Sequence, residues 1–282
     1  MKIELCDASA GNYLLKSDAY LGVALIMIAL YVLAEAYCIF SSIRTIQKVN
    51  LRDDIVLIPM MITLNVTLVF RVLYYFGGIK PFCYPNYWYY YFGDIANLSK
   101  DLCLLCLIVR VWDYLSSFET VNDPYPTNIT YTYYFMGIHF FAAYVFILIE
   151  DSQASDDLLF HYLGGVQIIL LFVFSYGFYK LFTTIRTNPD AKVEREVLVL
   201  NATSVLVIIT IFARIVYNLI FQNLENGEES DGREALIVTF SFNATSELFP
   251  CILITLILFF QQQNLKDSVL AGSGFGLKKA SE

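Results

Sequence analysis

Seven long apolar segments, joined by short polar connections, dominate this sequence of 282 residues. A helix needs about 20 apolar residues to cross the hydrocarbon core of a bilayer, and each segment is long enough. Hydrophobic residues make up 57% of the chain and charged residues 16%, against roughly 45–50% and about 25% in soluble domains. The sequence therefore predicts an all-α bundle of seven transmembrane helices, at 19–42, 54–76, 88–114, 131–150, 159–182, 194–222 and 235–261.

These segments and their connections form one expected transmembrane domain, 19–261, with a short segment at each end. The first segment, 1–18, carries Glu4, Asp7 and Asp18 and lacks the basic start and apolar run of a signal peptide. The last segment, 262–282, is rich in glycine and serine toward its end, which predicts a flexible tail. No room is left for a separate soluble domain.

Lysine and arginine are concentrated on every second connection. They occur in 44–52, in 180–195 and in the tail, whereas acidic residues gather in 150–157 and 225–231. Because basic loops stay in the cytosol, this pattern predicts a luminal or extracellular N-terminus and a cytosolic C-terminus. The triplet Asn128-Ile129-Thr130 is a glycosylation acceptor in an expected cytosolic connection, so its modification would reverse this orientation. The net charge of −8 gives no support to nucleic-acid binding, and membrane lipids are the expected surroundings.

Charged side chains inside the predicted helices are the candidate functional residues. Each costs about 2.5–3.5 kcal/mol on insertion scales and needs a partner or water. We expect Arg71 to pair with Asp94, and either Arg214 or Lys100 to pair with Glu247. Two interpretations stay open: a polar pocket or proton path facing the lumen, or interhelical pairs that lock the packing, which the near balance of acids and bases favours. The charged residues inside the predicted helices are Glu35, Arg71, Asp94, Lys100, Asp101, Arg214 and Glu247.

Two further features concern the placement of these charges. The third segment carries the most of them, so we expect it to be the helix most enclosed by its neighbours. Pro250 follows Glu247 by about one turn, and a proline inside a helix removes a hydrogen bond and bends the axis. Such a kink beside an acid is equally consistent with a site inside the bundle and with a contact that joins the kinked helix to its neighbour.

The six cysteines and two histidines show no catalytic or metal-binding pattern. Cys6 and Cys83 both fall on the predicted luminal side and are the candidate disulfide of this sequence. Cys103 and Cys106 have a redox-like spacing but lie in an apolar helix, where buried thiols are poor nucleophiles, so a packing role is expected. We therefore expect no metal, no cofactor and no enzymatic activity.

Three motifs in the C-terminal half resemble one known family. Residues 180–186 read Lys-Leu-Phe-Thr-Thr-Ile-Arg, a charged connector leads through Glu196-Val197 into the helix that bears Arg214, and the last helix reads Glu247-Leu248-Phe249-Pro250. The chain thus resembles the plant tobamovirus-multiplication family of seven-helix membrane proteins and its animal lysosomal, orphan-receptor-like relatives. Trp112-Asp113 departs from the family pattern, which has Trp-x-Glu.

The resemblance implies a non-enzymatic, receptor-like platform of endomembranes, vacuolar or lysosomal, with the plasma membrane as the alternative. It also implies recruitment of small GTPases of the Arf-like or Rag kind to a cytosolic surface, which here would contain Lys180, Arg186, Lys192 and Arg195. Two other functions stay open. The chain could be a structural or accessory subunit of a larger membrane complex, or a proton-coupled carrier or channel that uses Asp94, Asp101 and Glu247.

Overall fold

The computed structural model describes residues 20–48, 56–77, 79, 86–116, 125–149, 153–187, 195–225, 242 and 244–257. This part of the chain is helical and contains no β-strand. Its elements are α1 (Tyr20–Lys48), α2 (Leu57–Phe76), α3 (Asn86–Ser116), α4 (Tyr125–Ile149), α5 (Gln153–Thr187), α6 (Arg195–Glu225) and a last helical segment, Ala244–Ile257, which opens with the π-helical turn η3 (Ala244–Leu248).

Four helices in this part of the chain are long and apolar enough to cross a membrane. Their apolar spans are Leu21–Gln47, Leu57–Phe76, His161–Thr187 and Leu198–Val216, and the apolar segment Ala244–Ile257 is shorter. α3 and α4 fall outside this set, and α3 carries charged residues throughout its length. The structure thus supports a helical membrane protein. The count of seven crossings and the orientation of the termini stay predictions.

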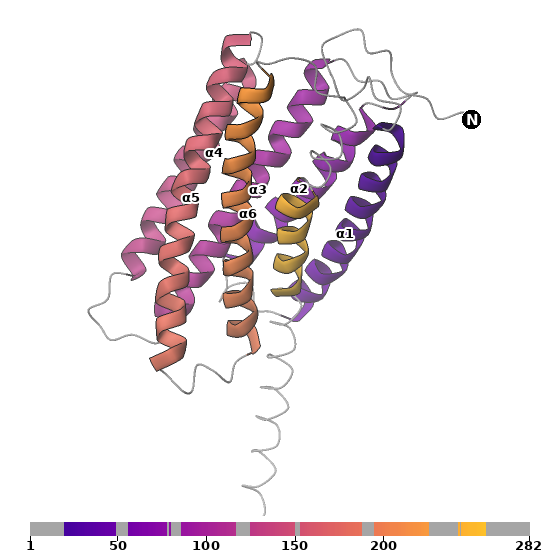
Figure 1. The fold of residues 1–282 in the computed structure, drawn as a ribbon. Coiled ribbons are helices and arrows are strands. Elements are labelled where there is room, and N and C mark those ends of the chain that lie inside the picture. Colours follow the sequence, from indigo (N-terminus) through magenta and orange to yellow (C-terminus); the bar gives the residue numbers. More distant parts are fainter. Residues whose placement is uncertain are drawn as a thin grey trace, which may run out of the picture.

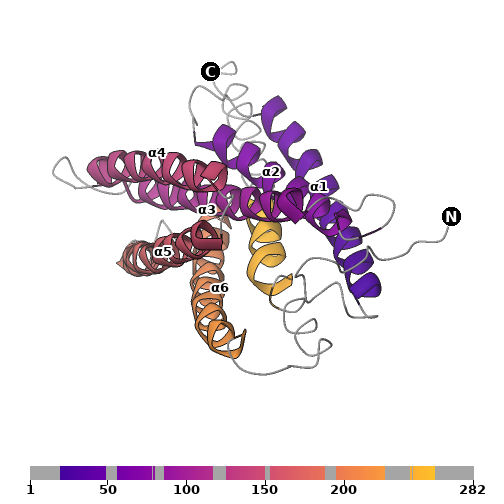
Figure 2. The same cartoon turned by 90° about the horizontal axis from the view of Figure 1, so that it is seen from above.

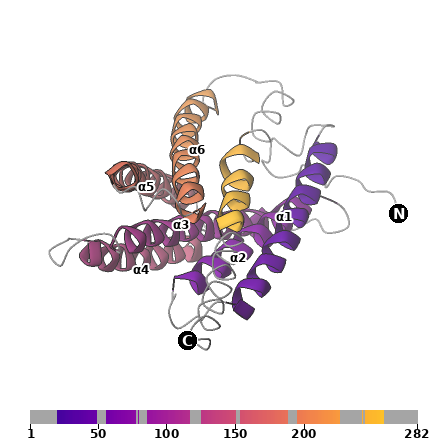
Figure 3. The same ribbon diagram turned by 90° about the horizontal axis from the view of Figure 1, so that it is seen from below.

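Consecutive helices run in alternating directions, so the ends of α1, α3 and α5 lie at the same end of the bundle as the starts of α2, α4 and α6 (Figure 1). α3 occupies the centre, where it packs against α2, α4 and α5 (Figures 2 and 3). Nearly every residue from Leu98 to Trp112 is buried, which makes α3 the most enclosed of the described helices. The expectation for the third helix is confirmed.

Large apolar side chains cover the outer faces of the bundle. Leu33 on α1, Phe141 on α4 and Phe172 on α5 are each about two-thirds exposed or more (68%, 70% and 70%). Arginine, lysine and carboxylate side chains, by contrast, lie buried against α3. An apolar exterior around a charged interior is the distribution expected when lipid solvates the outside of a helical bundle.

Three helices begin or end where the sequence did not predict it. α1 continues past residue 42 to Lys48, and in this stretch the Thr45 hydroxyl donates to the carbonyl of Ser41 at 2.8 Å without ending the helix. α4 begins at Tyr125 rather than 131, since Pro126 falls in the first turn, where a missing N–H costs no helical hydrogen bond. Asn128 therefore lies in a helix, not in a connection. α5 extends beyond the predicted 159–182 at both ends.

Candidate functional site

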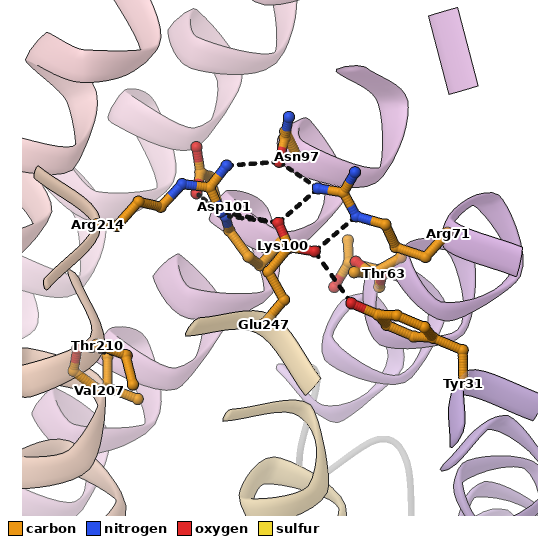
Figure 4. Close-up of polar contacts among 11 residues, drawn as sticks. Tyr31, Thr63, Arg71, Asn97, Lys100, Asp101, Val207, Thr210, Arg214 and Glu247 are labelled. Carbon is orange, nitrogen blue, oxygen red and sulfur yellow. Dashed lines mark hydrogen bonds and ion pairs between the residues drawn. The ribbon is translucent and has the colours of Figure 1, made fainter. Parts of the chain in front are cut away.

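Seven side chains from α1, α2, α3, α6 and η3 meet inside the bundle (Figure 4). Consecutive helices alternate in direction, so positions far apart in the sequence fall at one level. We call this set the ionic layer. It consists of Tyr31, Arg71, Asn97, Lys100, Asp101, Arg214 and Glu247.

Glu247 is the centre of the ionic layer. Its carboxylate accepts two hydrogen bonds from Arg71, from Nε to Oε2 at 2.6 Å and from Nη2 to Oε1 at 2.5 Å. Arg214 Nη1 donates to Oε1 at 2.9 Å and the Tyr31 hydroxyl to Oε2 at 3.2 Å. An ionised carboxylate offers about four acceptor positions, so these four bonds occupy all of them. With a side chain that is 1% exposed, Glu247 is a buried and saturated anion.

Asn97 provides a second bridge between the two arginines. Its side-chain oxygen accepts from Arg71 Nη2 at 2.6 Å and from Arg214 Nη2 at 2.7 Å. Arg71 and Arg214 therefore share two acceptors, Asn97 and Glu247, which hold two like charges side by side. Hydrogen bonds that involve an ionised partner are about twice as strong as neutral ones, so this ring joins α2, α3, α6 and η3 firmly.

The turn η3 explains how Glu247 reaches this position. Pro250 has no N–H to donate to the carbonyl of Ser246, and the chain widens into a π turn directly before the proline. Ser246, Glu247 and Leu248 are all buried, so three consecutive side chains face the interior. Single π turns inside helices are rare and are frequent at functional sites. The kink that Pro250 predicts thus takes the form of a π turn.

Lys100 lies between the two acids without a hydrogen bond to either. Its Nζ is 3.8 Å from Glu247 Oε1 and 3.8 Å from Asp101 Oδ1. Because Glu247 is already saturated, Lys100 can approach it only as an ion pair. Neither carboxylate oxygen of Asp101 accepts a hydrogen bond from the residues that the structure describes. Three cations (Arg71, Lys100 and Arg214) therefore face two carboxylates in the ionic layer.

The polar contacts continue from Asp101 into α4 and α5. His139 Nδ1 lies 3.0 Å from the hydroxyl of Tyr162, and the two rings stack with their centroids 5.7 Å apart. The carboxylate of Asp101 acts electrostatically on both residues. His139 has no ligand-type partners in the sequence, and the structure gives it a tyrosine on the neighbouring helix. α4 and α5 thus contribute a polar pair of their own to the interior of the bundle.

The structure brings together most of the charged residues singled out in the sequence. Lys100 and Arg214 both lie against Glu247, where one or the other was expected. Asp94 is half-buried on α3 one turn before Asn97, and its pairing with Arg71 stays a prediction. Glu35 lies outside the ionic layer.

The basic residues at the end of α5 lie apart from the ionic layer. Lys180 Nζ is 5.9 Å from the centroid of the Tyr176 ring, Arg186 is exposed, and Arg195 is the first residue of α6. Lys192 lies outside the described residues, as do the expected segments 1–18 and 262–282.

The cysteines within the described ranges are free, buried thiols: Cys38, Cys103, Cys106 and Cys251. This placement fits the packing role expected for Cys103 and Cys106. Cys6 and Cys83, the candidate disulfide, lie outside those ranges. No group of three or more His, Cys, Asp or Glu side chains that could hold a metal ion occurs among the described residues.

Asn97 and Tyr31 are the members of the ionic layer that the sequence analysis missed. Asn97 precedes Lys100 by three positions and Asp101 by four, so all three project from neighbouring positions of one helix. That spacing is the signal that could have found it. Tyr31 gives no such signal, since a lone tyrosine in an apolar helix is an ordinary residue.

No protein-family model and no curated protein sequence matches this chain.

Proposed function

We propose that this chain is a non-enzymatic membrane protein of seven helices that acts as a receptor-like platform for a cytosolic small GTPase of the Arf-like or Rag kind. Its N-terminus would face the lumen and its C-terminus the cytosol of an endomembrane, vacuolar or lysosomal. The proposal combines the family resemblance with one observation on the structure, the exposed end of α5.

The end of α5 exposes aromatic and basic side chains together. Tyr179 and Phe182 are 62% and 49% exposed, and Thr183 and Arg186 are also exposed. Residues 179, 183 and 186 are spaced so that they share one helix face. Aromatic residues and arginine are enriched at protein interfaces. This surface, Tyr179, Phe182, Thr183 and Arg186, is the proposed docking surface for the GTPase.

Two cation–π pairs support a cytosolic position for this end of the bundle. Arg44 lies over the ring of Phe40 at 4.4 Å on α1, and Lys180 lies 5.9 Å from the ring centroid of Tyr176 on α5. In both pairs a long basic side chain follows an aromatic residue by one turn near the end of a helix, as is common where side chains extend toward lipid headgroups. Basic residues favour the cytosolic leaflet.

Glu247 fits a fixed contact between helices better than a step of a transport path. Tyr31 lies about 20 Å from Arg44 along α1, at about 1.5 Å per residue, so the layer lies about 10 Å inside the opposite boundary of a hydrocarbon core of about 30 Å. A proton carrier needs a carboxylate with free acceptor positions, whereas those of Glu247 are all occupied. This favours interhelical locking for Glu247 and leaves the surface of the bundle for partners.

The test uses the full-length chain in lipid nanodiscs and purified Arf-like and Rag GTPases, each loaded with GDP or with a non-hydrolysable GTP analogue. We expect one GTPase to bind in one nucleotide state only. Tyr179→Ala with Arg186→Gln should weaken that binding about tenfold or more. Arg44→Gln removes a charge at the same end of the bundle, but on α1, and should leave binding unchanged. Absence of nucleotide-dependent binding to the unaltered chain would contradict the proposal.

A further inference from the structure

Glu35 is a carboxylate near the middle of α1, apart from the ionic layer. It lies about 14 Å along the helix from Arg44, which is close to half the thickness of a hydrocarbon core of about 30 Å. An ionisable side chain at this depth is expensive and is retained where it has a specific partner. The lipid headgroups are about as far from Glu35 as they can be.

Within the chain Glu35 lacks the kind of partner that Glu247 has. Its Oε2 is buried and accepts no hydrogen bond from the residues that the structure describes, and no cation of these residues forms an ion pair with it. Cys38, one turn further on, is close enough to interact with it electrostatically but carries no positive charge. Glu247, by contrast, accepts hydrogen bonds from side chains on three other helices, α1, α2 and α6.

The position of Glu35 on α1 places it at the border of the packed surface. Its neighbours on one side of the helix, Tyr31 and Cys38, are fully buried. Its neighbours on the other side, Val32 and Ile39, are 48% and 44% exposed. α1 packs on α2 and on η3, and it lies at the edge of the bundle (Figures 2 and 3). A helix placed beside the exposed side of α1 would therefore meet the half-buried Glu35 side chain on the side away from its covered Oε2.

We propose that Val32, Glu35 and Ile39 form a lateral docking surface for a transmembrane helix of a different protein, one that carries a lysine or arginine at the same depth. Charge complementarity argues for this occupant, because a buried carboxylate is compensated best by a cation. A second copy of this chain is a poor occupant, since a symmetric contact would place two Glu35 carboxylates opposite each other. This surface lies within the membrane and is separate from the GTPase surface on α5, so either proposal can fail alone.

The test uses the full-length chain in liposomes with synthetic leucine-rich transmembrane helices as probes, and association is measured by fluorescence energy transfer. One probe carries a central lysine, a second has leucine there and a third has glutamate. We expect the lysine probe to bind at least about tenfold more tightly than the other two. Glu35→Leu should abolish this preference, whereas Leu33→Ala on the far side of Glu35 should retain it.

A photocrosslinking residue locates the contact. At Ile39 it should crosslink to the lysine probe, and at Phe141 on α4, which is more exposed, it should not. Thermal unfolding of the Glu35→Leu chain checks that it is folded. Equal binding of the lysine and leucine probes, or an unchanged preference in Glu35→Leu, would overturn the proposal. Crosslinking at both positions alike would show non-specific association, which also overturns the proposal.

Discussion

Glu247 is the residue on which most of the buried polar contacts depend. Its charge is shared by Arg71 and Arg214, with Lys100 3.8 Å away. Removing one partner from a buried ion pair leaves the other charge uncompensated, which typically costs about 3–5 kcal/mol. At this site a single substitution affects several cations together.

Glu247→Gln is expected to reduce the free energy of unfolding by about 3–5 kcal/mol, because the guanidinium groups of Arg71 and Arg214 lose their counter-charge while the side-chain shape is kept. The measurement is reversible unfolding of the purified chain in detergent. Phe249→Leu is the matched control: it lies in the same helix and is half-exposed, so its effect should be within about 1 kcal/mol. Equal stability of the two variants would show that the ionic layer is not a lock.

Asp101 and Lys100 should respond unequally to neutralisation. Since the ionic layer contains more cations than carboxylates, Asp101→Asn increases the imbalance and Lys100→Met removes it. We therefore expect Asp101→Asn to cost about 3–5 kcal/mol and Lys100→Met clearly less. A double-mutant cycle with Lys100→Met and Asp101→Leu should give a combined loss below the sum of the single losses. Additive losses of stability, or a larger loss for Lys100→Met than for Asp101→Asn, would contradict the excess of cations in the ionic layer.

At the scale of the element, features that the lipid environment constrains, such as the pairing of charges, could be predicted from the sequence. Features that lipid does not constrain could not. Arg214 and Glu247 were expected to pair because charges inside apolar segments need partners. Asn97 was missed since a neutral amide has no comparable cost. The outer ends of α1 and α5 were missed because a helix outside the bilayer can be longer than its apolar segment. The presence of Pro250 predicted a kink in the last helix but not that the kink would be a π turn.

α6 is held to the rest of the bundle partly by Arg214. α6 packs on α5 and touches η3, and Arg214 links it through Glu247 and Asn97 to η3 and α3. Arg214→Leu should therefore increase hydrogen exchange in α6 more than in α3, since α3 keeps its contacts with α2, α4 and α5. Exchange is measured by mass spectrometry in nanodiscs. Phe212→Leu, at an exposed position two residues earlier, should leave the α6 pattern unchanged, and an equal rise in both variants would argue against the link.

At the scale of the whole molecule, the helical, lipid-facing nature of the chain follows from its apolar segments, and the central place of α3 follows from its charges. The order of helices around α3 could not be predicted, because an apolar exterior gives no information on which faces meet. The sequence also could not identify which helices lie on each side of the buried charges, since that depends on packing.

The orientation of the chain can be tested with two single cysteines in a background where Cys6 and Cys83 are serine. Thr187→Cys places a thiol at the exposed end of α5, and Gly22→Cys places one near the start of α1, where added atoms meet nothing within 4 Å. An impermeant maleimide should label Thr187→Cys from the cytosolic side alone and Gly22→Cys from the luminal side alone. Reversed labelling would contradict the orientation. Labelling of both cysteines from the same side would contradict the five membrane crossings predicted between residues 22 and 187.

The double bridge between Arg71 and Arg214 imposes an order on biosynthesis. The ribosome delivers both arginines to the membrane before it delivers Glu247, so the growing chain contains two guanidinium groups whose counter-ion has not yet been made. The carboxylate that both arginines share arrives with the last helical segment. The C-terminal segment therefore completes this bridge, and a chain that ends before residue 244 lacks the carboxylate that Arg71 and Arg214 share.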